Sequence, residues 1–294
     1  MTESDEYDEF GFLAESAREL GLQRTPPRLA RRDLGALSAL VWSDGPAELV
    51  FLHGGGQNAH TWDSVLLALG RPAVAFDLPG HGRSAWRADH DYGPWRNAEA
   101  IAAVLPALAP DARAVIGMSL GGVTALRLAA THPALVRKLV MIDVTPQVQE
   151  AVGAMNREEQ GSVALLREAP TFASLQAMEE AAITLSPNRS PEAVRRGVRH
   201  NAQRDANGAW TWRYDPNGRR STEDFTTLWD DVSRLACPVM LVAGGASKFV
   251  RAEHVKEFRR RQPALRVEHV AGAGHAVQSD KPLELARLIA DFTG

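Results

Sequence analysis

The feature that most constrains this chain of 294 residues is the pentapeptide Gly117-Met-Ser-Leu-Gly121, because an extended segment must become helical within it. The apolar run 112–118 leads into the serine, and a helical pattern, 120–131, follows at once. Such a change needs a tight, strained turn, and glycines on both sides of the serine keep its backbone free of collisions. The turn places the hydroxyl next to the amide groups of a helix start, which favour developing negative charge. The pattern therefore predicts that Ser119 is a nucleophile.

Short apolar runs alternate with helical patterns along most of the chain. The expected strands are 37–42, 48–53, 73–77, 112–118, 136–143, 239–243 and 266–271. The expected helices between them are 61–69, 97–109, 120–131, 253–261 and 282–292. Because buried strands that alternate with helices form parallel sheets covered on both faces, we predict an α/β fold with a mostly parallel central sheet.

The alternation stops between residues 145 and 235, where the chain is more polar and helical only in places. We therefore predict a core of residues 25–144 and 236–294, with a mainly helical lid or cap, 145–235, inserted into it. Within the insertion, helical patterns cover 157–168, 173–185 and 191–204. A lid over the carboxyl ends of the strands is expected, because ligands of open α/β sheets bind there. Residues 1–24 are expected to be an extension with one short amphipathic helix at about 10–20.

Four motifs in this order carry a resemblance to a known family. They are Leu-His-Gly-Gly-Gly at 52–56, Asp-Leu-Pro-Gly-His-Gly-Arg-Ser at 77–84, the serine turn, and Gly-Ala-Gly-His at 272–275. Together they resemble the α/β-hydrolase fold superfamily over about residues 28–144 and 235–292. The resemblance implies a serine nucleophile and a catalytic histidine, and it implies that the 77–84 segment is structural.

His275 is the expected general base among the nine histidines. It follows a predicted strand near the end of the chain, in a glycine loop that can aim its imidazole at Ser119. A serine that precedes the histidine in the chain also agrees with the order that the family resemblance implies.

The triad acid departs from the usual pattern of the family. In many members it follows the strand that corresponds to 238–243, but the loop 244–250 contains no carboxylate. Asp143 ends the apolar run 139–142, and the segment resembles a subgroup of small esterases with the acid after strand six. We therefore expect Asp143 to orient His275 and to stabilise the imidazolium, with Ser247 as a possible supporting group.

The glycine run after the strand 48–53 is the expected oxyanion loop, since acyl transfer needs two preorganised donors. The resemblance implies the backbone N–H groups of Gly55 and Leu120, with Gly56 as the next choice, and His53 is expected to hold the loop. Several residues on loops or in the insertion are expected to line an apolar substrate pocket, namely Gly56, Trp62, Trp210, Trp212, Phe249 and Val277.

Composition excludes several other classes of function. The net charge is −3, which suggests no nucleic-acid partner, and no apolar stretch is long enough to span a membrane. The acidic start of the chain lacks the features of a signal peptide, so a cytoplasmic location is expected. Neither His-x-x-x-His nor Cys–His spacings nor a dinucleotide loop is present, so no metal and no cofactor are expected.

These features favour a serine hydrolase that cleaves a carboxylic ester or thioester of a small, largely apolar molecule through an acyl-enzyme. Two alternatives stay open. One is hydrolysis of a carbon–carbon bond in a diketone-like compound, and the other is a ligand-binding or receptor protein with slow turnover. The sequence leaves the oligomeric state and the natural substrate open.

Overall fold

A single eight-stranded sheet forms the centre of the molecule. The computed structural model describes residues 7–23, 28–161, 163–164, 171–218 and 223–294. In these residues the strand order is β1-β2-β4-β3-β5-β6-β9-β10, and every pair from β4 to β10 is parallel. The strands are β1 (Ala30–Leu34), β2 (Leu37–Val41), β3 (Leu49–Leu52), β4 (Ala73–Asp77), β5 (Ala114–Met118), β6 (Leu139–Ile142), β9 (Val239–Gly244) and β10 (Arg266–Val270).

The sequence-based prediction of a mostly parallel α/β sheet is confirmed, and each predicted apolar run overlaps one of the strands. Strand β1 was not predicted. Its residues, Ala-Arg-Arg-Asp-Leu, are partly exposed at the sheet edge, and a polar edge strand gives no apolar signal. It pairs antiparallel with β2 through a turn at Gly35, whose φ is +78°.

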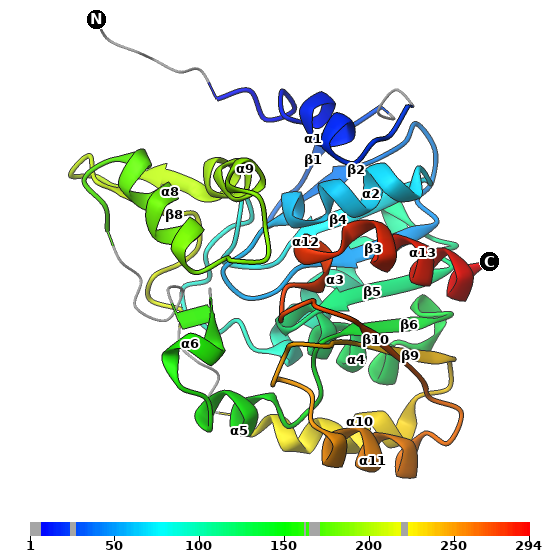
Figure 1. Ribbon diagram of the computed structural model, residues 1–294. Helices are drawn as coiled ribbons and strands as arrows, with labels where there is room; N and C mark the ends of the chain where they lie inside the picture. Colours follow the sequence, from blue (N-terminus) through cyan, green and yellow to red (C-terminus); the bar gives the residue numbers. More distant parts are fainter. Residues whose placement is uncertain (1–6, 24–27, 162, 165–170, 219–222) are drawn as a thin grey trace, which may run out of the picture.

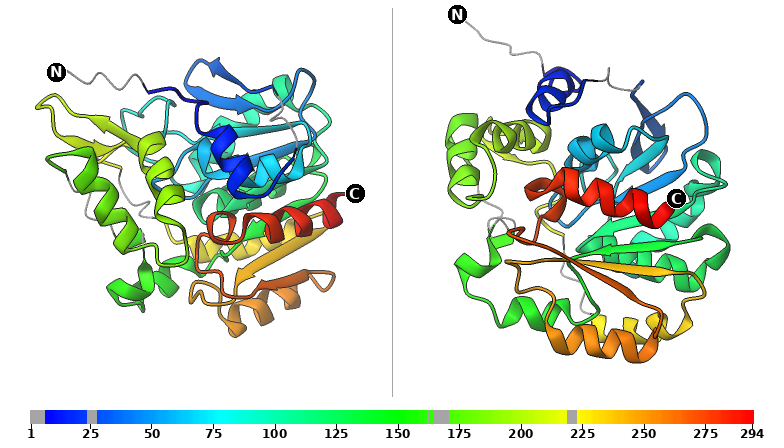
Figure 2. Two further views of the ribbon diagram at one scale, coloured as in Figure 1. Left: turned by 45° about the horizontal axis from the view of Figure 1, so that its top comes forward. Right: turned by 45° about the vertical axis from the view of Figure 1, so that its right-hand side comes forward.

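Helices cover both faces of the sheet (Figures 1 and 2). Alternate residues of each strand contribute to two separate apolar clusters, as the two-residue period of a strand requires. One cluster includes α1 (Leu13–Glu19), α2 (Asp63–Leu69) and α13 (Pro282–Thr293). The other includes α3 (Pro94–Leu108), α4 (Leu120–Thr131), α10 (Leu228–Arg234) and α11 (Ala252–Arg261). Among the described residues, no helix is long and apolar enough to cross a membrane.

The shorter helices lie in the connections between these elements. They are η1 (Ala59–Trp62) before α2, η2 (Pro133–Leu135) before β6, and α12 (Val277–Asp280) before α13. Helix η1 begins at Asn58, whose side chain accepts a hydrogen bond from the His60 N–H, and α2 follows it directly. The Asn58 amide also donates to the His200 carbonyl of α9 at 3.0 Å, which holds the loop from β3 against the cap.

A cap follows β6 and lies to one side of the sheet (Figure 1). Its elements are α5 (Val148–Gly153), α6 (Arg157–Gln160), α8 (Leu175–Thr184), α9 (Pro191–Asn201), the hairpin β7 (Ala202–Arg204) with β8 (Trp210–Trp212), and η3 (Phe225–Thr227). A small apolar cluster that includes Met178, Val198 and Trp212 holds α8, α9 and the hairpin together. The helix predicted over 191–204 ends at Asn201, because its last three residues pair with β8. Part of the predicted helix 157–168 lies outside the described residues.

Two helices of the predicted insertion contact the rest of the chain. Helix α10, which falls within the predicted range 145–235, packs on α4, and its Leu228 and Trp229 belong to the main core cluster. At the other side of the cap, Arg196 of α9 forms ion pairs with Glu15 and Glu19 of α1. Helix α1, which the sequence places in the extension, therefore contacts both the cap and the core.

Candidate active site

Ser119 lies in a strained turn between β5 and α4, as its glycine neighbours predict. Its φ is +51° and its ψ is −117°, which non-glycine residues rarely adopt. A Cβ at Gly117 would lie 2.2 Å from the Gly121 carbonyl oxygen, and one at Gly121 would lie 2.1 Å from the Leu52 carbonyl oxygen. Only glycine fits at these two positions, so the packing of β3, β5 and α4 fixes the turn that presents Ser119.

His275 and Asp143 form a hydrogen-bonded pair at the carboxyl end of the sheet. The His275 Nδ1 atom lies 2.7 Å from the Asp143 Oδ2 atom. The loop that carries His275 is held because the Gly274 N–H donates to Asp280 at 2.8 Å. The His275 Nε2 atom is buried and has no hydrogen-bond partner in the described part of the chain. A buried imidazole with one nitrogen fixed by a carboxylate and the other unpaired has the arrangement of a general base.

Asp143 is completely buried, and three donors surround its carboxylate. The Gly244 N–H donates to Oδ1 at 3.0 Å, whereas the Ser247 hydroxyl and His275 both bond to Oδ2. The residue has a φ of +50°, and its own N–H donates to the Val242 carbonyl at 2.8 Å. The adjacent strand β9 thus holds a strained backbone that turns the side chain toward His275.

Phe249 does not line the cavity beside Ser119, although the sequence predicts it in the substrate pocket. Its ring stacks on the His275 imidazole, with centroids 3.5 Å apart and planes at 11°. Its N–H donates to the Ser247 hydroxyl at 3.2 Å, so the same loop packs on His275 and hydrogen-bonds Asp143. Phe249 therefore restrains the plane of the His275 ring.

Gly55 and Leu120, the predicted oxyanion donors, both line the cavity beside Ser119. A Cβ at Gly55 would lie 3.9 Å from the Leu120 Cδ2 atom, which shows how closely the two segments approach. Leu120 begins α4, where backbone N–H groups have no partner within the helix. The arrangement can supply two amide donors to one oxygen atom.

The cavity beside Ser119 has a volume of about 630 Å³, within the usual size of small-molecule sites. Apolar side chains from α4, the cap and η3 form much of its lining, namely Leu120, Val123, Val148, Val152, Val163 and Phe225. Gly56, which the sequence predicts in the pocket, also lines it. Polar groups gather at one part of the wall, where the Tyr92 hydroxyl donates to Asp215 at 2.6 Å.

Four predicted pocket residues lie elsewhere. Trp62 and Val277 are fully buried in the core cluster that includes α2 and α13, and Trp62 packs against Phe51. Trp212 belongs to the cap cluster, and Trp210 lies beneath the Arg204 guanidinium. Their expected positions on loops or in the insertion gave no information on which side chains would be covered when the cap and helices packed.

Sequence reasoning missed most of the apolar residues that line this cavity. Val148, Val152 and Val163 belong to the start of the cap, and Phe225 to its end. The spacing of Val148 and Val152, one helical turn apart, was the available signal for an apolar face there. Tyr92 and Asp215 are 123 residues apart, and no local pattern relates them.

His53 and Asp77 support the loops around the site, as the resemblance implies. The Leu78 N–H donates to His53 Nε2 at 2.9 Å, and the other ring nitrogen bonds to the Gly54 carbonyl. Burial, with a contribution from nearby His81, lowers the pKa of His53 to about 3, so the ring stays neutral. Asp77 accepts hydrogen bonds from the Ala59 N–H and from Arg31. These residues connect the glycine loop to β4 and η1.

The fold and the site together define a class: α/β hydrolases in which a sheet carries a serine turn, an acid–histidine pair and a glycine loop at its carboxyl end. The alpha/beta hydrolase family model matches residues 49–288. The chain therefore belongs to the α/β hydrolase family.

Relatives across nearly the full length agree with this family. The chain is 48% identical to "Esterase Rv0045c" of Mycobacterium tuberculosis over 96% of its own length and 94% of that protein. A crystal structure of that esterase has a TM-score of 0.86 and covers 99% of both chains. The chain is also 28% identical to 2-(acetamidomethylene)succinate hydrolase of Mesorhizobium japonicum, over 89% of this chain and 94% of that one.

Proposed function

We propose that this chain is a carboxylic ester hydrolase that uses Ser119, His275 and Asp143 through an acyl-enzyme intermediate. The observation that carries the proposal is the buried His275–Asp143 pair with its 2.7 Å contact, beside a cavity that Ser119 lines. The similarity to an esterase at 48% identity supports the same reaction class. The apolar wall of the cavity favours a small ester whose acyl or alcohol part is largely apolar.

In the proposed reaction the Ser119 Oγ atom attacks the ester carbonyl carbon, and its proton passes to His275 Nε2. The N–H groups of Gly55 and Leu120 stabilise the oxyanion, while Asp143 keeps the Nδ1–H tautomer and stabilises the imidazolium. The tetrahedral intermediate then breaks its bond to the oxygen of the leaving alcohol, and the departing alkoxide takes the proton from His275. Water then attacks the acyl-serine with His275 as base, which releases the carboxylic acid and regenerates the hydroxyl.

Hydrolysis of p-nitrophenyl esters with acyl chains of increasing length tests this proposal. We expect multiple turnovers by the wild type and a loss of at least about 10³-fold in Ser119→Ala. A fluorophosphonate should add one covalent label to the wild type and none to Ser119→Ala, as detected by intact mass. A folded wild type that neither hydrolyses any ester nor takes the label would contradict the proposal and favour a ligand-binding role.

A further inference from the structure

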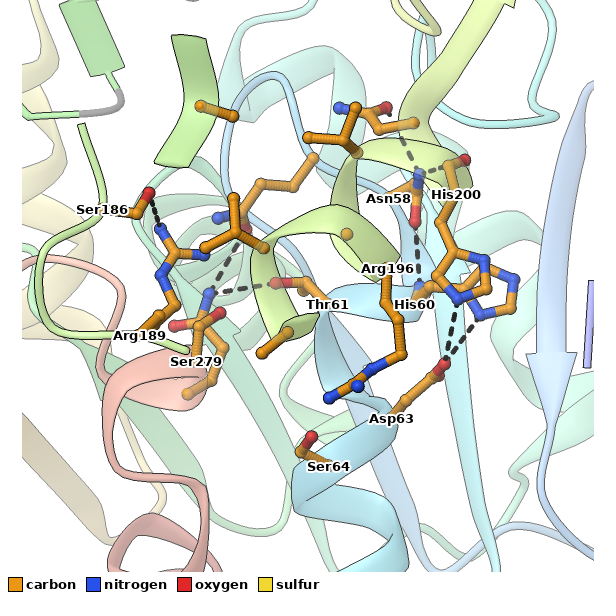
Figure 3. A pocket seen from close by; sticks show the side chains of 18 of the residues that line it. Asn58, His60, Thr61, Asp63, Ser64, Ser186, Arg189, Arg196, His200 and Ser279 are labelled. Carbon is orange, nitrogen blue, oxygen red and sulfur yellow. Dashed lines mark hydrogen bonds and ion pairs between the residues drawn. The ribbon is translucent and has the colours of Figure 1, made fainter. Parts of the chain in front are cut away.

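A second cavity, of about 190 Å³, lies between the cap and the core and shares Gly56 with the cavity beside Ser119. Three titratable side chains meet in its wall (Figure 3). His60 belongs to η1, Asp63 begins α2, and His200 lies in the last turn of α9. Their exposed fractions are only 8%, 7% and 7%, and the proposed ester reaction uses none of them.

The three side chains bring their ligand atoms close together. The His60 Nδ1 atom lies 2.9 Å from the Asp63 Oδ2 atom, and the His200 Nε2 atom lies 3.9 Å from the same oxygen (Figure 3). One ligand atom from each residue lies within 4.8 Å of the other two. Ligands on a tetrahedral zinc ion are about 3.4 Å apart, given bonds of about 2.0–2.1 Å. Small side-chain movements therefore suffice to surround an ion.

Both histidines also have the outer partners that metal-binding imidazoles require. The His60 Nε2 atom lies 3.1 Å from a Glu9 carboxylate oxygen, and the His200 Nδ1 atom lies 2.6 Å from the Tyr7 hydroxyl. When the outer nitrogen of each ring donates its proton to such a partner, the inner nitrogen presents a lone pair. With the outer protons directed to these partners, removal of the proton that His60 Nδ1 shares with Asp63 leaves lone pairs on both inner nitrogens.

The carboxylate of Asp63 is incompletely satisfied. Its Oδ1 atom is buried and has no hydrogen-bond partner among the described residues. Buried carboxylate oxygens normally have partners, so hydrogen bonding within the cluster does not account for this atom. The adjoining cavity can admit an ion and a water molecule to complete its coordination.

We propose that His60, Asp63 and His200 bind a divalent transition-metal ion, with a water molecule as the fourth ligand. Two imidazole nitrogens and one carboxylate oxygen suit Zn²⁺, Co²⁺ or Ni²⁺. The ion replaces the proton between His60 and Asp63, which is released to solvent. The rings of His60 and His200, now stacked at 3.8 Å and 6°, rotate apart so that both lone pairs reach the ion.

This site differs from the sequence-based expectation of no metal. His60 and Asp63 are neighbours in the chain, but His200 arrives from the cap, so no short spacing shows the set. The ion joins helix α2 of the core to helix α9 of the cap. The Asn201 side chain, next to His200, donates to the Gly56 carbonyl at 2.6 Å. The proposed metal site therefore lies close to the glycine loop.

Titration of the tag-free, chelator-treated full-length protein with Co²⁺ tests the site, because bound Co²⁺ absorbs visible light according to its coordination. We expect one equivalent to give a tetrahedral spectrum in the wild type. Affinity should fall at least about tenfold in Asp63→Asn and in His200→Gln, since even an outer partner of a ligand contributes about 10–100-fold. His275→Ala, which removes the base of the proposed esterase, should bind Co²⁺ like the wild type.

Circular dichroism and the thermal midpoint establish that each variant is folded. His200→Gln keeps the test valid if Asp63→Asn does not fold, because His200 lies near the end of a cap helix. Wild-type affinity in either folded variant, or loss of the spectrum in His275→Ala, would overturn the proposal. So would the absence of any tetrahedral spectrum in the folded wild type.

Discussion

Replacing Asp143 with asparagine tests how the candidate triad works, because the change keeps the shape of the side chain and removes its charge. The amide oxygen of the new side chain can still accept the Gly244 N–H, which now bonds to Oδ1 at 3.0 Å. The amide nitrogen then occupies the place of Oδ2, which contacts His275 and the Ser247 hydroxyl. An N–H donor at this point stabilises the tautomer of His275 that carries its proton on Nε2, and this tautomer cannot accept the proton of Ser119.

The expected loss in kcat is about 10³–10⁴-fold, as for other triads in which the amide replaces the acid. At about 1.36 kcal/mol for each factor of ten, the loss corresponds to roughly 4–5.5 kcal/mol of transition-state stabilisation. The fold should survive, since the buried position keeps its volume and two of its hydrogen bonds.

Turnover of a p-nitrophenyl ester and the urea midpoint should be measured together. Asp280→Asn is the matched control, because Asp280 accepts the Gly274 N–H in the loop of His275 without contacting the imidazole in the described structure. We expect its kcat to stay within about tenfold of the wild type. A folded Asp143→Asn protein whose kcat is also within tenfold would refute the assignment of the acid.

Four further substitutions test other parts of the structure. His53→Gln should make the stability of the protein less sensitive to acid. The pKa of His53 is about 3 in the folded protein and about 6.5 in the unfolded chain. The unfolded wild type therefore binds the extra proton, and its stability falls as the pH decreases from 6.5 toward 3. Urea unfolding should show that the loss between pH 7.5 and pH 5 is smaller by about 2 kcal/mol in the variant. Gly121→Ala should destabilise the fold by roughly 3 kcal/mol, because its Cβ meets the Leu52 backbone, whereas Gly197→Ala, in an open part of helix α9, should stabilise it by about 0.5–1 kcal/mol. Ser247→Ala should lower kcat roughly tenfold with little change in KM, since a hydrogen bond to a charged group contributes about 1.5–3 kcal/mol; an unchanged kcat would contradict its supporting role.

The sequence predicted the parts of the fold that local patterns determine. Strands buried on both faces are apolar throughout, so the runs at 73–77 and 114–118 were recognisable without tertiary information. The serine turn was equally visible, because the pentapeptide stands directly between an apolar run and a helical pattern. The contact with the Leu52 carbonyl that also requires Gly121 could be seen only in the fold. The same reasoning could not find β1, whose pairing with β2 depends on the sheet edge and not on apolar side chains.

Burial of aromatic residues could not be predicted, because it depends on elements that are distant in the sequence. Trp62 ends the short helix η1, and only the packing of α2 against the sheet shows that its ring is covered. The His60–Asp63–His200 cluster has the same origin, since the cap must fold back on the core before the two histidines stack. The residues that a side chain contacts across the boundary between cap and core cannot be inferred from the sequence of its own segment.

The position of the acid gives the last prediction, which concerns two adjacent strands. β6 and β9 are parallel neighbours, so the loops after them meet at the same end of the sheet, and Ser247 lies in the loop where many family members have the acid. Its hydroxyl already contacts the Asp143 carboxylate, so a carboxylate at 247 should reach His275 once Asp143 is removed. The double variant Asp143→Ser with Ser247→Asp should therefore have at least about tenfold higher kcat than Asp143→Ser alone. Ser247→Asp in the presence of Asp143 should be less active than the wild type, because two carboxylates would share one buried site. A double variant that is no faster than Asp143→Ser would show that the position of the loop after β9 does not by itself bring a carboxylate to His275. The strained backbone of Asp143, with its φ of +50°, would then be required to aim the acid.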